Sequence, residues 1–146
     1  MSQNKLFSVS ALLLSCLAFA APAATPDPVL QRQQLMKSFA PVTKDAMALR
    51  SAPDYDPVKA KAILKVYIDA AAKIPGLFPR SSRNSKTPNH ASPNIWTDAA
   101  GFKKTSVKFG ADAKAGLKAT DTAQFADVFK NIVADCSSCH ETYRVK

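Results

Sequence analysis

One helix-start pattern recurs along this chain: a residue that can cap a helix, followed by proline at the first helical position. An Asp or Ser side chain accepts hydrogen bonds from the free backbone amides of the first turn. Proline fits the first helical position because it has no N–H group that would need a partner there. A fourth start pairs Asp121 with Gln124, as in a capping box. Helices are therefore predicted to begin near Asp121 and at three Xaa-Pro pairs: Asp27-Pro28, Asp56-Pro57 and Ser92-Pro93.

Each of the four stretches also carries apolar residues at helical spacing, and none alternates over a useful length as a strand does. These positions are Val29, Met36, Phe39, Val42, Ala46 and Leu49; then Ala60, Ile63, Leu64, Tyr67, Ala70, Ala71 and Ile74; then Ile95, Ala99, Phe102, Ser106, Phe109 and Ala113; and last Phe125, Val128, Phe129, Ile132, Val133 and Cys136. The chain has only 4 glycines, which argues against a turn-rich β fold. The pattern predicts an all-α fold, an antiparallel four-helix bundle.

The links between the stretches differ in length. The links at 51–55 and near Ala119 are short, so the helices they join are expected to be antiparallel neighbours. The link at 75–92 is long, rich in Pro, Ser, Asn and basic residues, and is expected to cross one end of the bundle. Pro41 lies inside the first stretch, where it is expected to kink or split the helix.

The N-terminus has the features of a secretory signal. Lys5 precedes an apolar run at 6–20, and Ala-x-Ala sites follow it. We therefore expect a signal peptide at 1–23, cleaved near 20–24, and a mature domain at 24–146 that is exported to the periplasm. Cys16 would be lost with the signal. No later apolar run reaches the length of a membrane span, so none is expected in the mature chain.

The C-terminus carries the pentapeptide Cys136-Ser137-Ser138-Cys139-His140, the attachment signature of haem c. Thiols three residues apart lie on neighbouring faces of one helical turn, where each can form a thioether with one vinyl group of a porphyrin. His140 is four residues from Cys136, on the same face, and can be the proximal iron ligand. One covalently bound haem c per chain is expected, attached through two thioethers.

Three other interpretations of this motif remain open. A disulfide oxidoreductase places its reactive thiol at a helix N-terminus, whereas this motif lies at a helix C-terminal end. A zinc site needs a fourth ligand, and the only other histidine is His90, in a polar link. The third is a plain disulfide beside an exposed histidine. Haem attachment agrees best with the export signal and the bundle pattern.

The motif, followed by Glu141-Thr142-Tyr143-Arg144-Val145-Lys146 at the extreme C-terminus, resembles the class II c-type cytochromes, the family of cytochrome c-prime. Ser92-Pro93-Asn94-Ile95-Trp96, and Arg32 four residues before Met36, are also similar to the family. The resemblance covers essentially the whole mature chain. It implies a four-helix bundle with haem near one end. It also implies that Arg32 contacts a haem propionate and that Arg144 lies near the proximal histidine. An ordinary solvated charge is the alternative for each arginine.

The resemblance further implies that a residue of the first helix faces the second side of the iron, and Met36 is at that position. In the low-spin branch of the family a methionine there is the sixth ligand, and we expect Met36 to play this part. As an alternative, Met36 only packs in the core, and a five-coordinate haem binds NO or CO as in cytochrome c-prime. Candidate haem-packing residues, for each of which core packing is an equal alternative, are Phe39, Trp96, Phe102 and Phe109.

The formal net charge of +9 comes largely from lysines spread along the helices, which is what solvated helix faces carry; the functional alternative is attraction of an acidic redox partner. Nucleic acid is not expected for an exported chain without a recognition motif. No peroxidase-type His–Arg pair accompanies the motif, so an electron carrier rather than an enzyme is expected. The family includes dimers, so the resemblance leaves a homodimer open.

Overall fold

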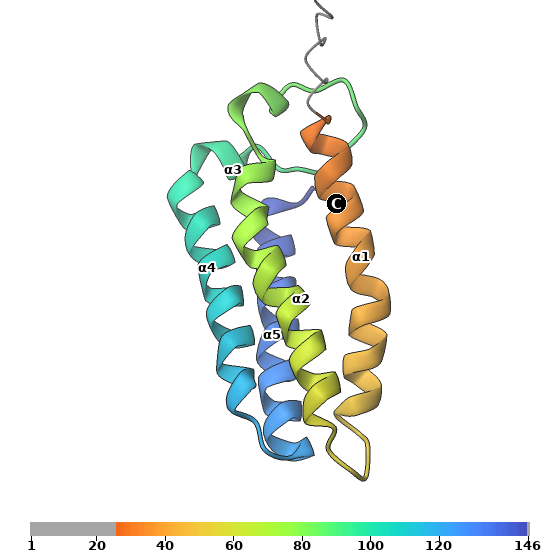
Figure 1. Cartoon of the computed structure of the whole chain (residues 1–146). Coiled ribbons are helices and arrows are strands. Elements are labelled where there is room, and N and C mark those ends of the chain that lie inside the picture. Colours follow the sequence, from red (N-terminus) through yellow and green to blue (C-terminus); the bar gives the residue numbers. More distant parts are fainter. Residues whose placement is uncertain (1–25, 146) are drawn as a thin grey trace, which may run out of the picture.

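The computed structural model describes residues 26–145. The expected signal peptide at 1–23 lies outside these residues. Four long helices make up the bundle, and shorter helical turns connect them (Figure 1). The elements are α1 (Pro28–Leu49), α2 (Pro57–Lys73), η1 (Ile74–Leu77), η2 (Arg80–Ser82), α3 (Asn94–Thr97), α4 (Ala99–Ala115), η3 (Gly116–Lys118) and α5 (Thr122–Tyr143). No strand forms within the described residues, and the prediction of an all-α bundle is confirmed.

The predicted caps start three of the long helices. Asp27 accepts a hydrogen bond from the Val29 amide at 2.8 Å, and Pro28 follows it at the start of α1. Asp56 caps α2 in the same way, through the amides of residues 58 and 59. Asp121 accepts from the Gln124 amide at 2.8 Å, and the Gln124 side chain reaches back to the other carboxylate oxygen.

The third stretch differs from the prediction, because it forms two helices instead of one. The short α3 ends at Thr97, and Asp98 leaves the helical conformation at φ −119° and ψ 56°. The Asp98 carboxylate accepts from the Gly101 amide at 3.0 Å and so starts α4. It also accepts from the Tyr143 hydroxyl at 2.8 Å. An aspartate that can cap a new helix and bond to α5 interrupts the helix that the apolar spacing predicted.

Pro41 does not split the first helix, which runs unbroken from Pro28 to Leu49. Proline removes one backbone hydrogen bond, the one that would reach the Lys37 carbonyl. Lys37 and Pro41 are both exposed, so water can satisfy that carbonyl. The prediction of a split helix was wrong for this reason.

The helices pack in sequence, with α1 against α2, α2 against α4, and α4 against α5 (Figure 1). By contrast, α1 and α5 make few contacts with each other. The core follows the predicted stripes, and its largest fully buried side chains are Val29, Leu64, Tyr67, Phe125, Phe129 and Ile132. The fourth side of the bundle, between α1 and α5, is therefore its loosest.

The link at 75–92, with η1 and η2, crosses one end of the bundle as predicted (Figure 1). We call residues 74–92 the crossover. Three side chains of α1 hold it: Asp27 accepts from the Thr87 hydroxyl, Gln33 donates to the Pro88 carbonyl, and Arg32 makes several contacts that are described below.

Candidate haem site

Cys136, Cys139 and His140 lie in the last two turns of α5. Cys136 and His140 are exposed and Cys139 is half-buried. Cys136 and Cys139 are both free thiols, so the plain disulfide receives no support. Desolvation by the surrounding atoms raises the pKa of both thiols. A disulfide oxidoreductase needs the opposite shift, because its nucleophile is the thiolate.

A zinc site also receives no support. Within residues 26–145, no group of three His, Cys, Asp or Glu side chains is placed to hold a metal ion. The surroundings of His140 favour the neutral form of its imidazole. Desolvation of the ring and then the positive charge of Arg144 lower its pKa. Arg144 itself is exposed, and its amide caps the end of α5 by donating to the His140 carbonyl.

The apolar stripe of α5 divides into two faces near its C-terminal end. Phe125, Phe129 and Ile132 are buried in the core, whereas Val133 is 40% exposed and Cys136 is exposed. The prediction that Val133 and Cys136 continue the core stripe was wrong. These two residues and His140 recur every three or four residues, so they share a face of α5 that is turned away from the core.

Met36 lies on α1, which borders the same loose side of the bundle as α5. Its side chain is half-buried and packs against the edge of the core. Met47, the other methionine of α1, is 50% exposed. Met36 is therefore the more sheltered of the two methionines, and its role as the sixth ligand stays a prediction.

Arg32 is only 4% exposed and lies one turn before Met36. Its Nη1 donates to the Leu77 carbonyl at 3.2 Å and to Ser82 Oγ at 3.0 Å, and its Nη2 donates to Asn89 Oδ1 at 3.1 Å. The guanidinium also stacks over Phe78, 4.6 Å from the ring centroid. Among the described residues no carboxylate is within ion-pair distance of it. The charge of Asp27 acts on Arg32 from beyond that distance, so the buried guanidinium has no direct ion pair and fits an anionic group such as a haem propionate.

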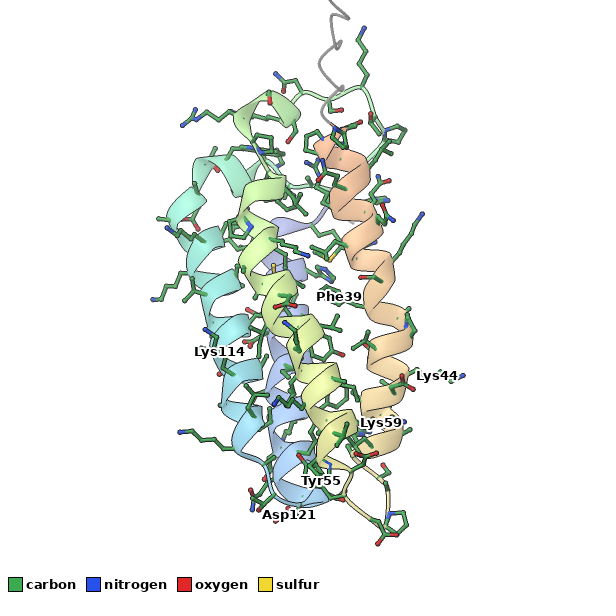
Figure 2. The ribbon with its side chains drawn as sticks, in the orientation of Figure 1. Phe39, Lys44, Tyr55, Lys59, Lys114 and Asp121 are labelled. Carbon is green, nitrogen blue, oxygen red and sulfur yellow. The ribbon has the colours of Figure 1, made fainter. Side chains whose placement is uncertain are left out.

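The predicted haem-packing aromatics lie in two clusters. Phe39 points into the bundle from α1 (Figure 2), 5.7 Å from the Tyr67 ring and 6.2 Å from the Phe109 ring. Phe102 lies two turns before Phe109 on α4 and packs edge to face with Phe78 at 4.9 Å and with Tyr143 at 5.2 Å. Trp96 joins this second cluster and donates from its indole to the Phe78 carbonyl at 3.1 Å. The haem-packing role of these residues stays a prediction.

Sequence reasoning missed Asp135, which directly precedes Cys136. It is 5% exposed, and its Oδ1 accepts from Lys108 Nζ of α4 at 2.5 Å. The same ammonium donates to Asp112 at 2.7 Å, so two carboxylates share one lysine. Burial raises the pKa of Asp135. The sequence signal that could have pointed to Asp135 is an acidic residue directly beside an apolar position of the α5 stripe.

A family model described as Cytochrome C′ matches residues 27–144. The chain is also 33% identical over 140 residues to cytochrome c-556 of Agrobacterium fabrum, an alignment that covers 94% of this chain and 93% of the relative. This chain belongs to the cytochrome c′ family. The resemblance inferred from the C-terminal motif is thereby confirmed, and so is the four-helix bundle that it implied.

Solved structures of the cytochrome c′ family share this fold. Cytochrome c′ from Rhodopseudomonas palustris superposes with a TM-score of 0.74 at 29% identity, over 84% of this chain and 98% of that chain. Oxidised cytochrome c556 from R. palustris gives a TM-score of 0.71 at 28% identity, over the same shares. The similarity thus extends to chains named c′ and chains named c556.

The residues present fit the haem c of a cytochrome c′ family member. Two thiols and an imidazole occur on one turn of α5, and exposed Val133 extends the same face with apolar surface. The adjoining side of the bundle is loosely packed, and Arg32 supplies a buried positive charge at the crossover end.

Proposed function

We propose that this protein is an exported c-type cytochrome that carries single electrons on one haem. The observation that carries the proposal is the open face of α5 on which Cys136 and His140 lie, beside the loose side of a cytochrome c′ bundle. Haem c, when bound, supplies reversible one-electron chemistry between ferric and ferrous iron. The protein supplies ligands, low dielectric and a surface for partners.

The side chains of α5 attach and orient the group. When haem c is bound, the Cys136 and Cys139 thiols would hold it through two thioethers, and the neutral imidazole of His140 would be the proximal ligand. The lowered pKa of His140 supports this role, because a protonated ring nitrogen has no lone pair for a metal. Arg144 stays near the proximal histidine, and Arg32 neutralises a propionate.

Met36 is the proposed sixth ligand. A thioether is a good axial ligand for haem iron and raises its reduction potential. The half-buried position of Met36, one turn from Arg32, supports this role. The competing function is a five-coordinate haem that binds NO or CO, in which Met36 only packs over the iron.

Absorption spectra before and after addition of CO test the proposal. The protein, produced with haem-attachment machinery, is expected to be low-spin and to resist CO. The Met36→Ala variant is expected to become high-spin and bind CO, whereas the matched Met47→Ala variant keeps the parent spectrum. A Met36→Ala protein with an unchanged low-spin spectrum would remove the sixth-ligand assignment, and a high-spin parent that binds CO would favour gas binding.

Export to the periplasm and an acidic redox partner complete the proposal. Cleavage near 20–24 removes Lys5 and leaves a formal charge of +8 on the mature chain. In the part of the chain that the structure describes, no helix has the length and apolar character to span a bilayer. N-terminal sequencing of protein from a periplasmic extract tests the cleavage: a sequence starting near residue 24 is expected, and an intact Met1 would contradict it.

A homodimer through α1 and α2 is part of the same proposal. A groove of about 700 Å³ runs between α1, α2 and η1, and its apolar lining includes Leu35, Ala72 and Leu77. One solved cytochrome c′, at 19% identity, is described as having an unusual ligand-controlled dimer dissociation. Light scattering is expected to find a dimer. The Gln34→Arg substitution, at the wall of the groove, is expected to weaken that dimer. A monomeric parent protein would contradict this surface.

A further inference from the structure

The crossover segment itself carries positive charge without acidic residues. Residues 70–97 contain no Asp or Glu. This span does contain four cations that are all exposed: Lys73, Arg80, Arg83 and Lys86. None of the four forms an ion pair with any residue that the structure describes. We call Arg80, Arg83 and Lys86, which lie in the crossover itself, the basic cap.

The nearest aspartates at this end are already bonded within the protein. Asp27 accepts from the Thr87 hydroxyl and from the Val29 amide, both at 2.8 Å. Asp98 accepts from the Tyr143 hydroxyl at 2.8 Å and from the Gly101 amide at 3.0 Å. These hydrogen bonds hold the two carboxylates against the bundle, so they are not free to pair with the arginines and lysines of the basic cap.

The rest of the surface is charged differently. The opposite end of the bundle, where Tyr55 and Asp121 lie (Figure 2), also carries Asp54 and Asp56. On the sides of the bundle several lysines are paired, such as Lys65 with Asp69 at 2.9 Å and Lys59 with Asp45 at 3.9 Å. The cations of the crossover therefore lie in a stretch without acidic residues, whereas most lysines elsewhere lie on helices that also carry aspartates.

The crossover is attached to both segments that carry the proposed iron ligands. Arg32, one turn before Met36, donates to residues 77, 82 and 89. Beyond His140, the Ser92 amide donates to the Tyr143 carbonyl at 3.0 Å, and the Val145 amide donates to the His90 carbonyl at 2.9 Å. The basic cap is thus fixed rigidly at the end of the molecule where the haem motif lies.

We propose that the basic cap is the docking surface for an acidic protein partner in electron transfer. The inference rests on the proposed function and adds to it the surface and the chemistry of the partner. Unpaired exposed cations attract an acidic surface and orient the encounter, while the attachment of the crossover brings that partner to the haem end. The paired lysines of α2 and α4 contribute less, because their fields are largely cancelled at short range.

Two triple variants of equal charge test this proposal. One reverses the basic cap with Arg80→Glu, Arg83→Glu and Lys86→Glu. The matched control reverses three exposed lysines elsewhere with Lys61→Glu, Lys114→Glu and Lys118→Glu. Flavodoxin, an acidic electron-transfer protein, is the probe. Its dissociation constant is measured by NMR titration, and its rate of electron exchange by stopped flow, at low and at high salt.

The basic-cap variant is expected to bind flavodoxin about tenfold more weakly at low salt and to lose most of the salt dependence of the rate. The control variant, with the same net charge, is expected to stay within about threefold of the parent. Equal losses in both variants would overturn the proposal, because net charge rather than the cap would then govern binding. Binding to phosphatidylglycerol vesicles is measured in the same way. If reversal of the basic cap weakened binding to the vesicles but not to flavodoxin, the basic cap would be a membrane-binding surface and the proposal would be overturned.

The haem spectrum keeps the two proposals distinguishable. A parent protein without covalent haem contradicts the proposed function. A parent with haem and normal electron exchange, whose affinity for flavodoxin does not change when the cap is reversed, contradicts only the docking surface.

Discussion

Arg32 joins three parts of the crossover through one side chain. Its guanidinium is buried and bonds to Leu77, Ser82 and Asn89. The apolar spacing of α1 marks position 32 as inward-facing, but its partners lie 45 to 57 residues away, so the sequence did not predict them. A buried arginine at this position therefore has a structural role beside the propionate contact that stays a prediction.

Replacement of Arg32 by methionine is expected to lower the free energy of unfolding by about 3 kcal/mol, because it leaves buried acceptors without donors. Urea denaturation followed by circular dichroism measures the change. Arg32→Lys keeps the charge but not the fork of donors, so an intermediate loss is expected. A methionine variant as stable as the parent would contradict the role of Arg32 in holding the crossover.

The free energy of unfolding should depend on pH through Asp135, and the surroundings of this carboxyl group set the sign of that dependence. Burial raises its pKa, so the folded state binds this proton more tightly than the unfolded state does. Stability should fall as pH rises from the ordinary aspartate pKa through the raised one. Asp112 has the opposite sign, because the Lys108 hydrogen bond lowers its pKa, and its contribution is lost as pH falls through that lowered value.

Urea midpoints between pH 3.5 and pH 7 test this assignment. The Asp135→Asn variant is expected to lose the decrease in stability with rising pH, since its amide does not ionise. The Asp112→Asn variant is expected to lose the change at the acid end and to keep a smaller decrease, because the Asp112 charge also raises the pKa of Asp135. Parallel pH profiles for Asp135→Asn and the parent would show that the Asp135 proton does not govern stability in this range.

At the level of elements, the sequence predicted the long helices well because their caps are local. Asp27, Asp56 and Asp121 each bond to amides two or three residues away, and such contacts can be inferred from residue order alone. The division between α3 and α4 was not predicted, because Asp98 has a partner 45 residues away, Tyr143. Similarly, the two faces of α5 could not be separated by spacing, which does not show where the neighbouring helices lie.

Asp98 should therefore contribute more to thermal stability than an ordinary N-cap residue does. Asp98→Ala is expected to lower the melting temperature by about 3–8 °C, since it removes the α4 cap and the acceptor for Tyr143. Asp121→Ala removes the cap of α5 and is expected to have a smaller effect, because its carboxylate bonds only within its own first turn. Differential scanning calorimetry compares the two. Equal decreases would contradict the contribution of the Tyr143 bond.

At the scale of the whole molecule, the bundle has three well-packed sides and one loose side, between α1 and α5. A ligand that binds only the folded state stabilises it. The proposed haem-binding residues lie on α1 and α5, the two helices that border this loose side, so the protein is expected to depend on haem for much of its stability. The sequence predicted the four long helices and their antiparallel order, but not which side of the bundle is loose, because that depends on how side chains from separate helices meet.

The Cys136→Ser, Cys139→Ser double variant tests this dependence. It is expected to retain helical circular dichroism and to unfold at a much lower urea concentration than the haem-bearing parent. Serine is close in size to cysteine, so the protein packing changes little. An unchanged urea midpoint would mean that the helices alone supply the stability.

The central claim is that one haem is covalently held by the C-terminal motif. The intact mass of the mature protein, produced with haem-attachment machinery and measured under denaturing conditions, tests it most directly. We predict the mass of the chain cleaved near residue 24 plus one haem, and no added haem in the Cys136→Ser, Cys139→Ser variant. A parent protein with the mass of the polypeptide alone would contradict the account.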